Sequence, residues 1–255
     1  MLSAIESSLI IAGSILAALL LLRISRRFWL PKTRHQHNDV IGWQISFLST
    51  TYAVIIAFML SDVWTNYQNA ETNTEVEANS LLNIFRVAEG LPEPQRVQVP
   101  QLAMRYAETM IQEEWPAMTH GTFSKNGFRN TSDLWKAIMS TRAQTGSEQA
   151  SFEHALSDLT NMTEHRRIRH LQSRSKLPGI FWLVLIVGGV MTVAYTCLFD
   201  IEATRMHVVQ VVGVTFVISL VLVTIADIDG PYGGAVRIQP TAFEMALQTM
   251  MRSAQ

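Results

Sequence analysis

Four apolar segments constrain this chain more than any other feature of its sequence. Each is about 20 residues long, the length that an α-helix needs to cross about 30 Å of hydrocarbon. The first contains a single charged residue, Glu6, and the other three contain none. The segments cover residues 2–22, 41–60, 177–199 and 208–226. The sequence therefore predicts an all-α membrane protein with four transmembrane helices.

The first apolar segment is expected to remain as a membrane anchor. A signal peptide carries positive charge before its apolar region and small residues after it. Here Glu6 lies at the beginning, and Arg23, Arg26 and Arg27 follow the segment. The only cysteine, Cys197, lies inside the third apolar segment, so it indicates neither a redox compartment nor a metal site.

The polar stretch between the second and third segments has the periodicity of helices. Steps of three and four residues, with a gap at Glu71, separate its apolar positions, which is typical of one helical face. These positions are Trp64, Tyr67, Thr74, Ala78, Leu81, Phe85 and Ala88. No helix-breaking residue follows Leu60, so the second transmembrane helix is expected to continue into water as far as Gly90. The predicted division is 1–60 (two transmembrane helices with a basic loop), 61–176 (an all-α extramembrane domain inserted between helices two and three), 177–226 (two transmembrane helices) and 227–255 (a turn and tail).

Three further helices are expected in the extramembrane domain. Residues 95–118 form an amphipathic segment, and residues 120–131, with two glycines, read as a loop. Ser132 and Ser147 are candidate N-caps of the two helices that follow. The second of these helices becomes basic before Leu177-Pro178, where proline is suited to open the third transmembrane helix.

The second helix and its extension read AFMLSDVWTNYQNAETNTEVEANSLLNIFR, and the fourth helix leads into ADIDGPYGGAVRIQPTAFE. These two stretches resemble bestrophins. The order of parts also agrees, with two helices, a helical domain, two helices and then an acidic, proline- and glycine-containing turn. The chain is most similar to the bestrophin-like group of bacterial membrane proteins, whose recurrent features resemble His37-Asn38, Glu77-Ala78, Glu114-Trp115-Pro116 and Leu177-Pro178.

The resemblance implies a function and an assembly. Bestrophins are pentameric ion channels in which five copies of the second helix line an axial pore. The expected function is thus passive conduction of small inorganic ions by a homo-oligomer, a pentamer by resemblance, in the lipid bilayer of a bacterial inner membrane. The resemblance also implies a cytoplasmic domain. Charge leaves the orientation open, because the basic loop at residues 23–34 favours the opposite orientation and the basic residues from Arg166 to Lys176 favour a cytoplasmic domain. A non-conducting scaffold or signalling protein is the alternative.

Two neighbouring stripes on the second helix are candidates for the pore lining. One carries small and polar residues, which either line a wet pathway or let helices pack closely. The other is apolar and ends at Asp62, which would form a charged ring and favour cations in a symmetric oligomer, or would simply be solvated at the membrane boundary. Anion selectivity would follow the animal bestrophins. The candidates are Ser46, Phe47, Thr50, Thr51, Val54, Ile55, Phe58 and Asp62.

The turn after the fourth helix is interpreted as a structural clasp. Its members are Asp227, Asp229, Gly230, Pro231, Tyr232 and Gly233. Gly230, Gly233 and Gly234 would permit positive φ angles. In animal bestrophins this clasp binds calcium, but Gly234-Ala235-Val236-Arg237 lacks the acidic run, and we expect no metal here. The aspartates could instead pair with the basic residues between Arg166 and Lys176.

Nothing in the sequence indicates an enzyme or a cofactor. Glu113 and Glu114 diverge by about 100° on a helix, which favours a solvated helix end over acid–base catalysis. His35, His37 and Asp39 have the residue types of a metal site but no fourth partner. No serine elbow, phosphate-binding glycine loop or Cys-x-x-Cys motif is present, and a net charge of −1 argues against nucleic acid as a partner.

Overall fold

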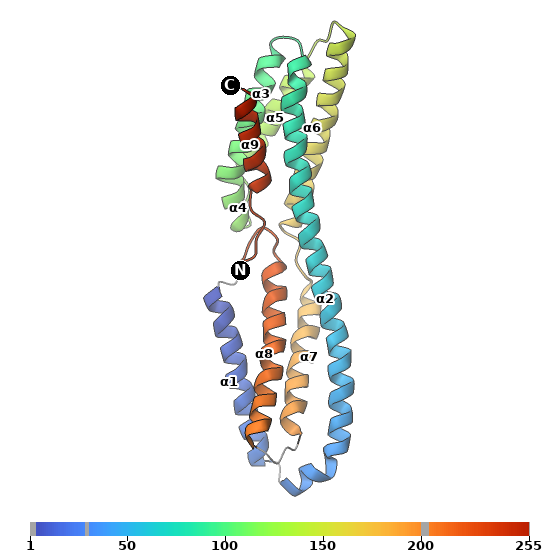
Figure 1. The fold of residues 1–255 in the computed structure, drawn as a ribbon, viewed down its shortest axis with the longest axis vertical. Helices are drawn as coiled ribbons and strands as arrows, with labels where there is room; N and C mark the ends of the chain where they lie inside the picture. Colours follow the sequence, from blue (N-terminus) through green and yellow to red (C-terminus); the bar gives the residue numbers. More distant parts are fainter. Residues whose placement is uncertain (1–3, 29–30, 200–203, 255) are drawn as a thin grey trace. The chain divides into compact units, whose positions relative to one another are not determined.

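The computed structural model describes residues 4–28, 31–199 and 204–254, without the side chains of residues 31–37. Within these ranges the chain forms helices joined by turns, and no strand occurs (Figure 1). The all-α prediction is therefore confirmed.

Four helices are long and apolar enough to span a membrane, as predicted. They are α1 (Ala4–Phe28), α2 (Pro31–Val87), α7 (Gly179–Leu198) and α8 (Thr204–Ile228). The second helix runs on without a break for 57 residues, and the short 3₁₀ helix η1 (Ala88–Gly90) ends it where the sequence indicated.

By packing, the chain divides into two units. The first comprises Met1–Thr65 and Lys176–Asp229, and the second comprises Asn66–Ser175 and Gly230–Gln255. Helix α2 contributes to both. The four-part division into residues 1–60, 61–176, 177–226 and 227–255 remains a prediction about domains.

The first unit contains the membrane-spanning segments. Helix α1 packs on α8 and α7 around a small core of Ala18, Leu22, Cys197 and Val211. At one end of this group, Nε2–H of the buried His207 donates to the Thr196 carbonyl at 2.9 Å, and Arg26 donates to its Nδ1 at 2.9 Å. These two bonds use the neutral form of the imidazole.

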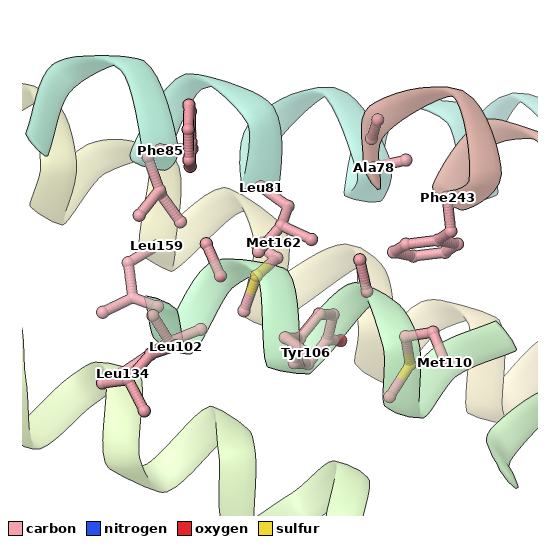
Figure 2. Packing of buried hydrophobic residues seen from close by; sticks show 14 of the residues in the cluster. Ala78, Leu81, Phe85, Leu102, Tyr106, Met110, Leu134, Leu159, Met162 and Phe243 are labelled. Carbon is pink, nitrogen blue, oxygen red and sulfur yellow. The ribbon is translucent and has the colours of Figure 1, made fainter. Parts of the chain in front are cut away.

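The second unit packs helices around the remainder of α2. They are α3 (Gln95–Thr109), the π-helical turn η2 (Met110–Glu114), α4 (Trp115–Thr119), α5 (Lys125–Met139), α6 (Gly146–Gln172) and α9 (Thr241–Ser253). Figure 2 shows the apolar side chains of α2, α3, α5, α6 and α9 meeting between the helices. Labelled examples are Leu81, Tyr106, Leu134, Met162 and Phe243. The C-terminal helix α9 thus completes the core of this unit.

Both predicted N-caps in this unit were wrong. Helix α5 begins after Ser124, whose hydroxyl accepts the N–H groups of Asn126 and Gly127, so residues 125–131 are helical and Ser132 lies inside the helix. Helix α6 is capped by Thr145, two residues before Ser147. Thr145 and Glu148 form a capping box, with the carboxylate at the third helical position accepting the backbone N–H of the cap.

Candidate pore-lining face and the buried ion-pair network

One face of the transmembrane part of α2 is packed against the chain itself. Ile41, Tyr52 and Val63 are buried and lie 11 residues apart, about three helical turns, so they form one line. The Tyr52 hydroxyl donates to the Leu185 carbonyl of α7 at 2.6 Å. Its ring lies where a Cβ on Gly188 would come within 2.5 Å of it. These contacts fix the rotation of α2 about its own axis.

The predicted pore residues lie on the remaining surface of α2. All eight are exposed in the single chain except Ile55, which is half-buried. Phe47 and Phe58 are 65% and 68% exposed, and their spacing of 11 residues places them on one line. Thr51 and Asp62 have the same spacing, so the carboxylate continues a neighbouring line of hydroxyl and apolar groups.

The hydroxyl groups of this face point their hydrogens into their own helix. Ser46, Thr50 and Thr51 each donate to the carbonyl four residues earlier, at 2.8 to 2.9 Å. The lone pairs of these hydroxyl oxygens remain available to accept a hydrogen bond or to bind a cation. Together with the Asp62 carboxylate, this face offers acceptors of hydrogen bonds and ligands for cations rather than donors for anions.

The clasp residues are shared between the two units. Asp229 directly follows α8, and its Oδ1 accepts the Leu177 N–H at 2.7 Å. Burial raises the pKa of Asp229, although this hydrogen bond and the charge of Lys176 act in the opposite direction. Asp227 lies in the last turn of α8. Both aspartates thus belong with the first unit, where Asp229 caps the start of the segment leading into α7.

The other four clasp residues belong to the second unit. Gly233 N–H donates to the Gly230 carbonyl, and the Ile238 N–H donates to the Pro231 carbonyl at 2.8 Å. The Tyr232 hydroxyl lies 3.1 Å from both Thr74 Oγ1 and the Ala70 carbonyl of α2. Of the three glycines expected at positive φ, only Gly234 has it, with φ of 83°.

No cluster of three or more histidine, cysteine, aspartate or glutamate side chains that could hold a metal occurs among the described residues. The side chains of His35 and His37 lie outside the described part of the chain.

A largely buried network of ionisable side chains forms the polar centre of the second unit. Its members are Glu77 of α2, Tyr106 of α3, Glu114 of η2, and Arg166, Arg169 and His170 of α6. Arg169 is fully buried and binds both carboxylate oxygens of Glu77, Nε at 2.7 Å and Nη2 at 3.0 Å. Tyr106 donates to the same carboxylate at 2.6 Å. The geometry is the bidentate arrangement in which an arginine–carboxylate pair is strongest.

Glu114 is the second buried carboxylate of this network. It accepts hydrogen bonds from His170 Nε2 at 2.6 Å, from the Ser124 N–H at 2.9 Å and from Arg166 at 3.3 Å. Burial favours its neutral form, but these bonds and the nearby arginine charges outweigh burial and lower its pKa to about 2. The expectation of a solvated helix end is therefore wrong for Glu114, although Glu113 is exposed.

Comparison with known proteins identifies the chain. A family model described as the bestrophin-like domain matches residues 12–243. The chain belongs to the bestrophin-like family. No curated protein sequence matches it significantly.

Solved structures share the fold of this bestrophin-like protein at low sequence identity. A mutant of a bacterial bestrophin homologue from Klebsiella pneumoniae is 11% identical, with a TM-score of 0.71 over 94% of this chain and 99% of the other. A second mutant of that homologue has a TM-score of 0.65 at 11% identity, over 96% of this chain and 98% of the other. A structure described only as that of a membrane protein has a TM-score of 0.72 at 10% identity, over 95% of this chain and 97% of the other.

Sequence reasoning missed the buried network of this bestrophin-like protein, yet a signal for it exists. The apolar face of α6 runs through Ala155, Leu159 and Met162 at steps of four and three, and the same steps continue to Arg166 and Arg169. An apolar stripe that leads directly into arginines predicts buried cations that need buried anions. The basic segment was instead interpreted as a membrane-end cluster available to Asp227 and Asp229.

Proposed function

We propose that this bestrophin-like protein conducts small ions passively through a pore lined by α2 in a homo-oligomer, a pentamer as in bestrophins. The observation that carries the proposal is the exposed face of α2. In the single chain it presents hydroxyl oxygens and a carboxylate along a membrane-spanning segment, while the separate line of Ile41, Tyr52 and Val63 is packed.

The chemistry of this face supports a wet environment. An ionised carboxylate facing hydrocarbon is costly, so such groups face a bundle interior or a water-filled cavity. Symmetric repetition would bring the Asp62 side chains into one ring and the Phe47 and Phe58 rings into apolar constrictions. We propose that the ring favours cations.

Two measurements test the proposal. The mass of the purified protein in detergent should be that of an oligomer, because one or two copies of α2 cannot enclose an axial pore. Recording from the protein in planar bilayers should show conductance, and Asp62→Asn should reduce the preference for cations. Glu89→Gln is the matched control, since it removes one exposed carboxylate outside the membrane-spanning segments.

Each outcome separates the candidates. Unchanged selectivity in Asp62→Asn would remove the carboxylate from the filter without removing the pore. Silence across salts and voltages would instead favour a scaffold, in which the exposed face of α2 packs against a partner. The hydroxyls that bond within their own helix are compatible with such close packing.

We further propose a multi-pass protein of the bacterial inner membrane whose second unit is cytoplasmic. Gln144 is exposed in the turn before α6, and the native Cys197 is buried. A Gln144→Cys variant should therefore resist a membrane-impermeant thiol reagent in intact cells and react after lysis. Rapid labelling of intact cells would place the second unit outside.

A further inference from the structure

A partly open cavity of about 430 Å³ lies between the membrane-spanning helices α1, α7 and α8 of the first unit. This volume lies within the range of small-molecule sites, about 300–1,000 Å³. Aliphatic side chains and small residues line it, together with the ring of Trp182 and the hydroxyl-bearing residues Ser14, Thr215 and Ser219. Among the described residues, no charged side chain lines it. The cavity thus suits an uncharged, largely apolar occupant.

The dimensions of the cavity match one leaflet of a bilayer. Its lining covers residues 10–21 of α1, 182–193 of α7 and 215–226 of α8. At a rise of about 1.5 Å per residue, each stretch is about 17 Å long. Half of the hydrocarbon core is about 15 Å thick. The lining reaches the start of α7 at Trp182 and the end of α8 at Ala226, so the cavity follows the leaflet on that side.

The cavity differs from an ordinary seam of small residues between packed helices. In such a seam, the small residues let helices touch and hydroxyls bond across the interface. Ser219 is only 6% exposed, yet neither it nor Ser14 makes a hydrogen bond within the described part of the chain. Thr215, one turn away, does donate to a carbonyl, that of Val211. Helices α7 and α8 touch along part of this lining, where a Cβ on Gly189 would lie 3.1 Å from Ile218, and the small side chains leave space beside that contact.

Water is a poor occupant of this space. A buried water needs two to four polar partners, and the lining offers only separated hydroxyls among aliphatic groups. An empty apolar space forfeits dispersion contacts along its whole wall. We propose that this cavity binds one acyl chain of a phospholipid from the adjoining leaflet, with the lipid headgroup at the level of Trp182 and Ala226.

Photo-crosslinking tests the proposal directly. The oligomer in vesicles would be irradiated with a phosphatidylcholine that carries a diazirine half-way along one acyl chain, and adducts would be mapped by mass spectrometry. We expect adducts concentrated on the residues that line the cavity, Ser219 and Leu222 above all, relative to outward residues of α8 such as Val217. Equal labelling of both sets would overturn the proposal, as would an unlabelled cavity.

A cavity-filling variant sharpens the test. Ser219→Phe should abolish most labelling of the cavity lining and leave labelling of outward residues unchanged. Val217→Phe adds the same ring to the same helix at a position that is 58% exposed, so it should leave the cavity labelled. If Ser219→Phe does not fold, Ser219→Leu fills less of the space, and the wild-type adduct pattern alone still decides. Persistent cavity labelling in a folded Ser219→Phe variant would refute the site.

Discussion

Removing Arg169 should destabilise the second unit strongly. Its guanidinium binds both oxygens of Glu77, lies within 3.8 Å of Glu114 and sits 5.0 Å above the Trp115 ring. Arg169→Met keeps much of the side-chain length but leaves Glu77 as a fully buried carboxylate whose one remaining hydrogen-bond partner among the described residues is the Tyr106 hydroxyl. Loss of one member of a buried ion pair costs about 3–5 kcal/mol.

The assay is thermal unfolding of the purified protein in mild detergent, followed through its intrinsic tryptophan fluorescence, to which the buried Trp115 contributes. At about 2–4 °C per kcal/mol for a chain of this size, the unfolding temperature should fall by about 6–20 °C. Arg167→Met is the matched control, because Arg167 is exposed on the same helix. Its effect should stay within about 0.5 kcal/mol.

Replacing the whole interaction distinguishes an uncompensated charge from lost packing. A triple variant, Glu77→Leu with Tyr106→Phe and Arg169→Met, removes the carboxylate and the donor that would otherwise lose its acceptor. Apolar replacement of a buried ion pair is often nearly neutral, so the triple variant should be more stable than Arg169→Met alone. If Arg169→Met behaves like the Arg167 control, or if the triple variant is the less stable of the two, the reasoning is refuted.

Four further predictions concern other contacts. The pKa of Glu114 is about 2 in the folded protein, below the 4.5 of an ordinary glutamate, so its contribution to stability is present above about pH 4.5 and is lost as the pH falls towards 2. Glu114→Gln should therefore lower stability at neutral pH and flatten the fall in unfolding temperature between pH 4.5 and 2. An unchanged acid profile would contradict this. Gly127→Ala places a Cβ 2.7 Å from Arg166 Nη2 and 3.0 Å from Glu114 Oε2, so it should lower the unfolding temperature although alanine is the better helix former by about 1 kcal/mol. Gly146→Ala is the control: nothing lies within 4 Å of its added Cβ, so it should not lower the unfolding temperature. Gly188→Ala should reduce the yield of folded protein because its Cβ would lie 2.5 Å from the Tyr52 ring, and Tyr52→Ala should restore the yield if that clash is the cause. Pro231→Ala loosens the turn between Asp229 and Tyr232 and should disturb assembly, measured by size-exclusion chromatography, or gating, measured in bilayers. A variant normal in both would contradict the interpretation of this turn as a structural clasp.

The transmembrane helices could be predicted because their signal is local. Every apolar residue from Ile41 to Leu60 contributes to it, and helix α2 continues through Ser61 because no residue there breaks it. The caps illustrate where local reasoning fails. Ser124 and Ser132 are equivalent in type, but only Ser124 also bonds to Glu113, at 2.7 Å, a residue 11 positions away. The choice between them depends on tertiary contacts.

The candidate sites show the same difference. Periodicity placed Ser46 and Phe47 on neighbouring stripes of α2, but the packing of Tyr52 against α7 is what identifies the exposed side. The burial of Glu114 depends on partners 52 and 56 residues away, Arg166 and His170. The sequence does not indicate which of two adjacent acidic residues on a helix has such partners.

The π-helical turn at Met110–Glu114 has a consequence for comparing this chain with its relatives. A π-helical turn holds more residues than an α-helical one, so it shifts every later side chain around the helix axis. Glu114 is the last residue of that turn and Trp115 follows it, and both face Arg169. A relative with a regular α-helix here would need a one-residue gap in the alignment to match them. A gap-free alignment through this helix would pair the buried acid with a residue that faces solvent.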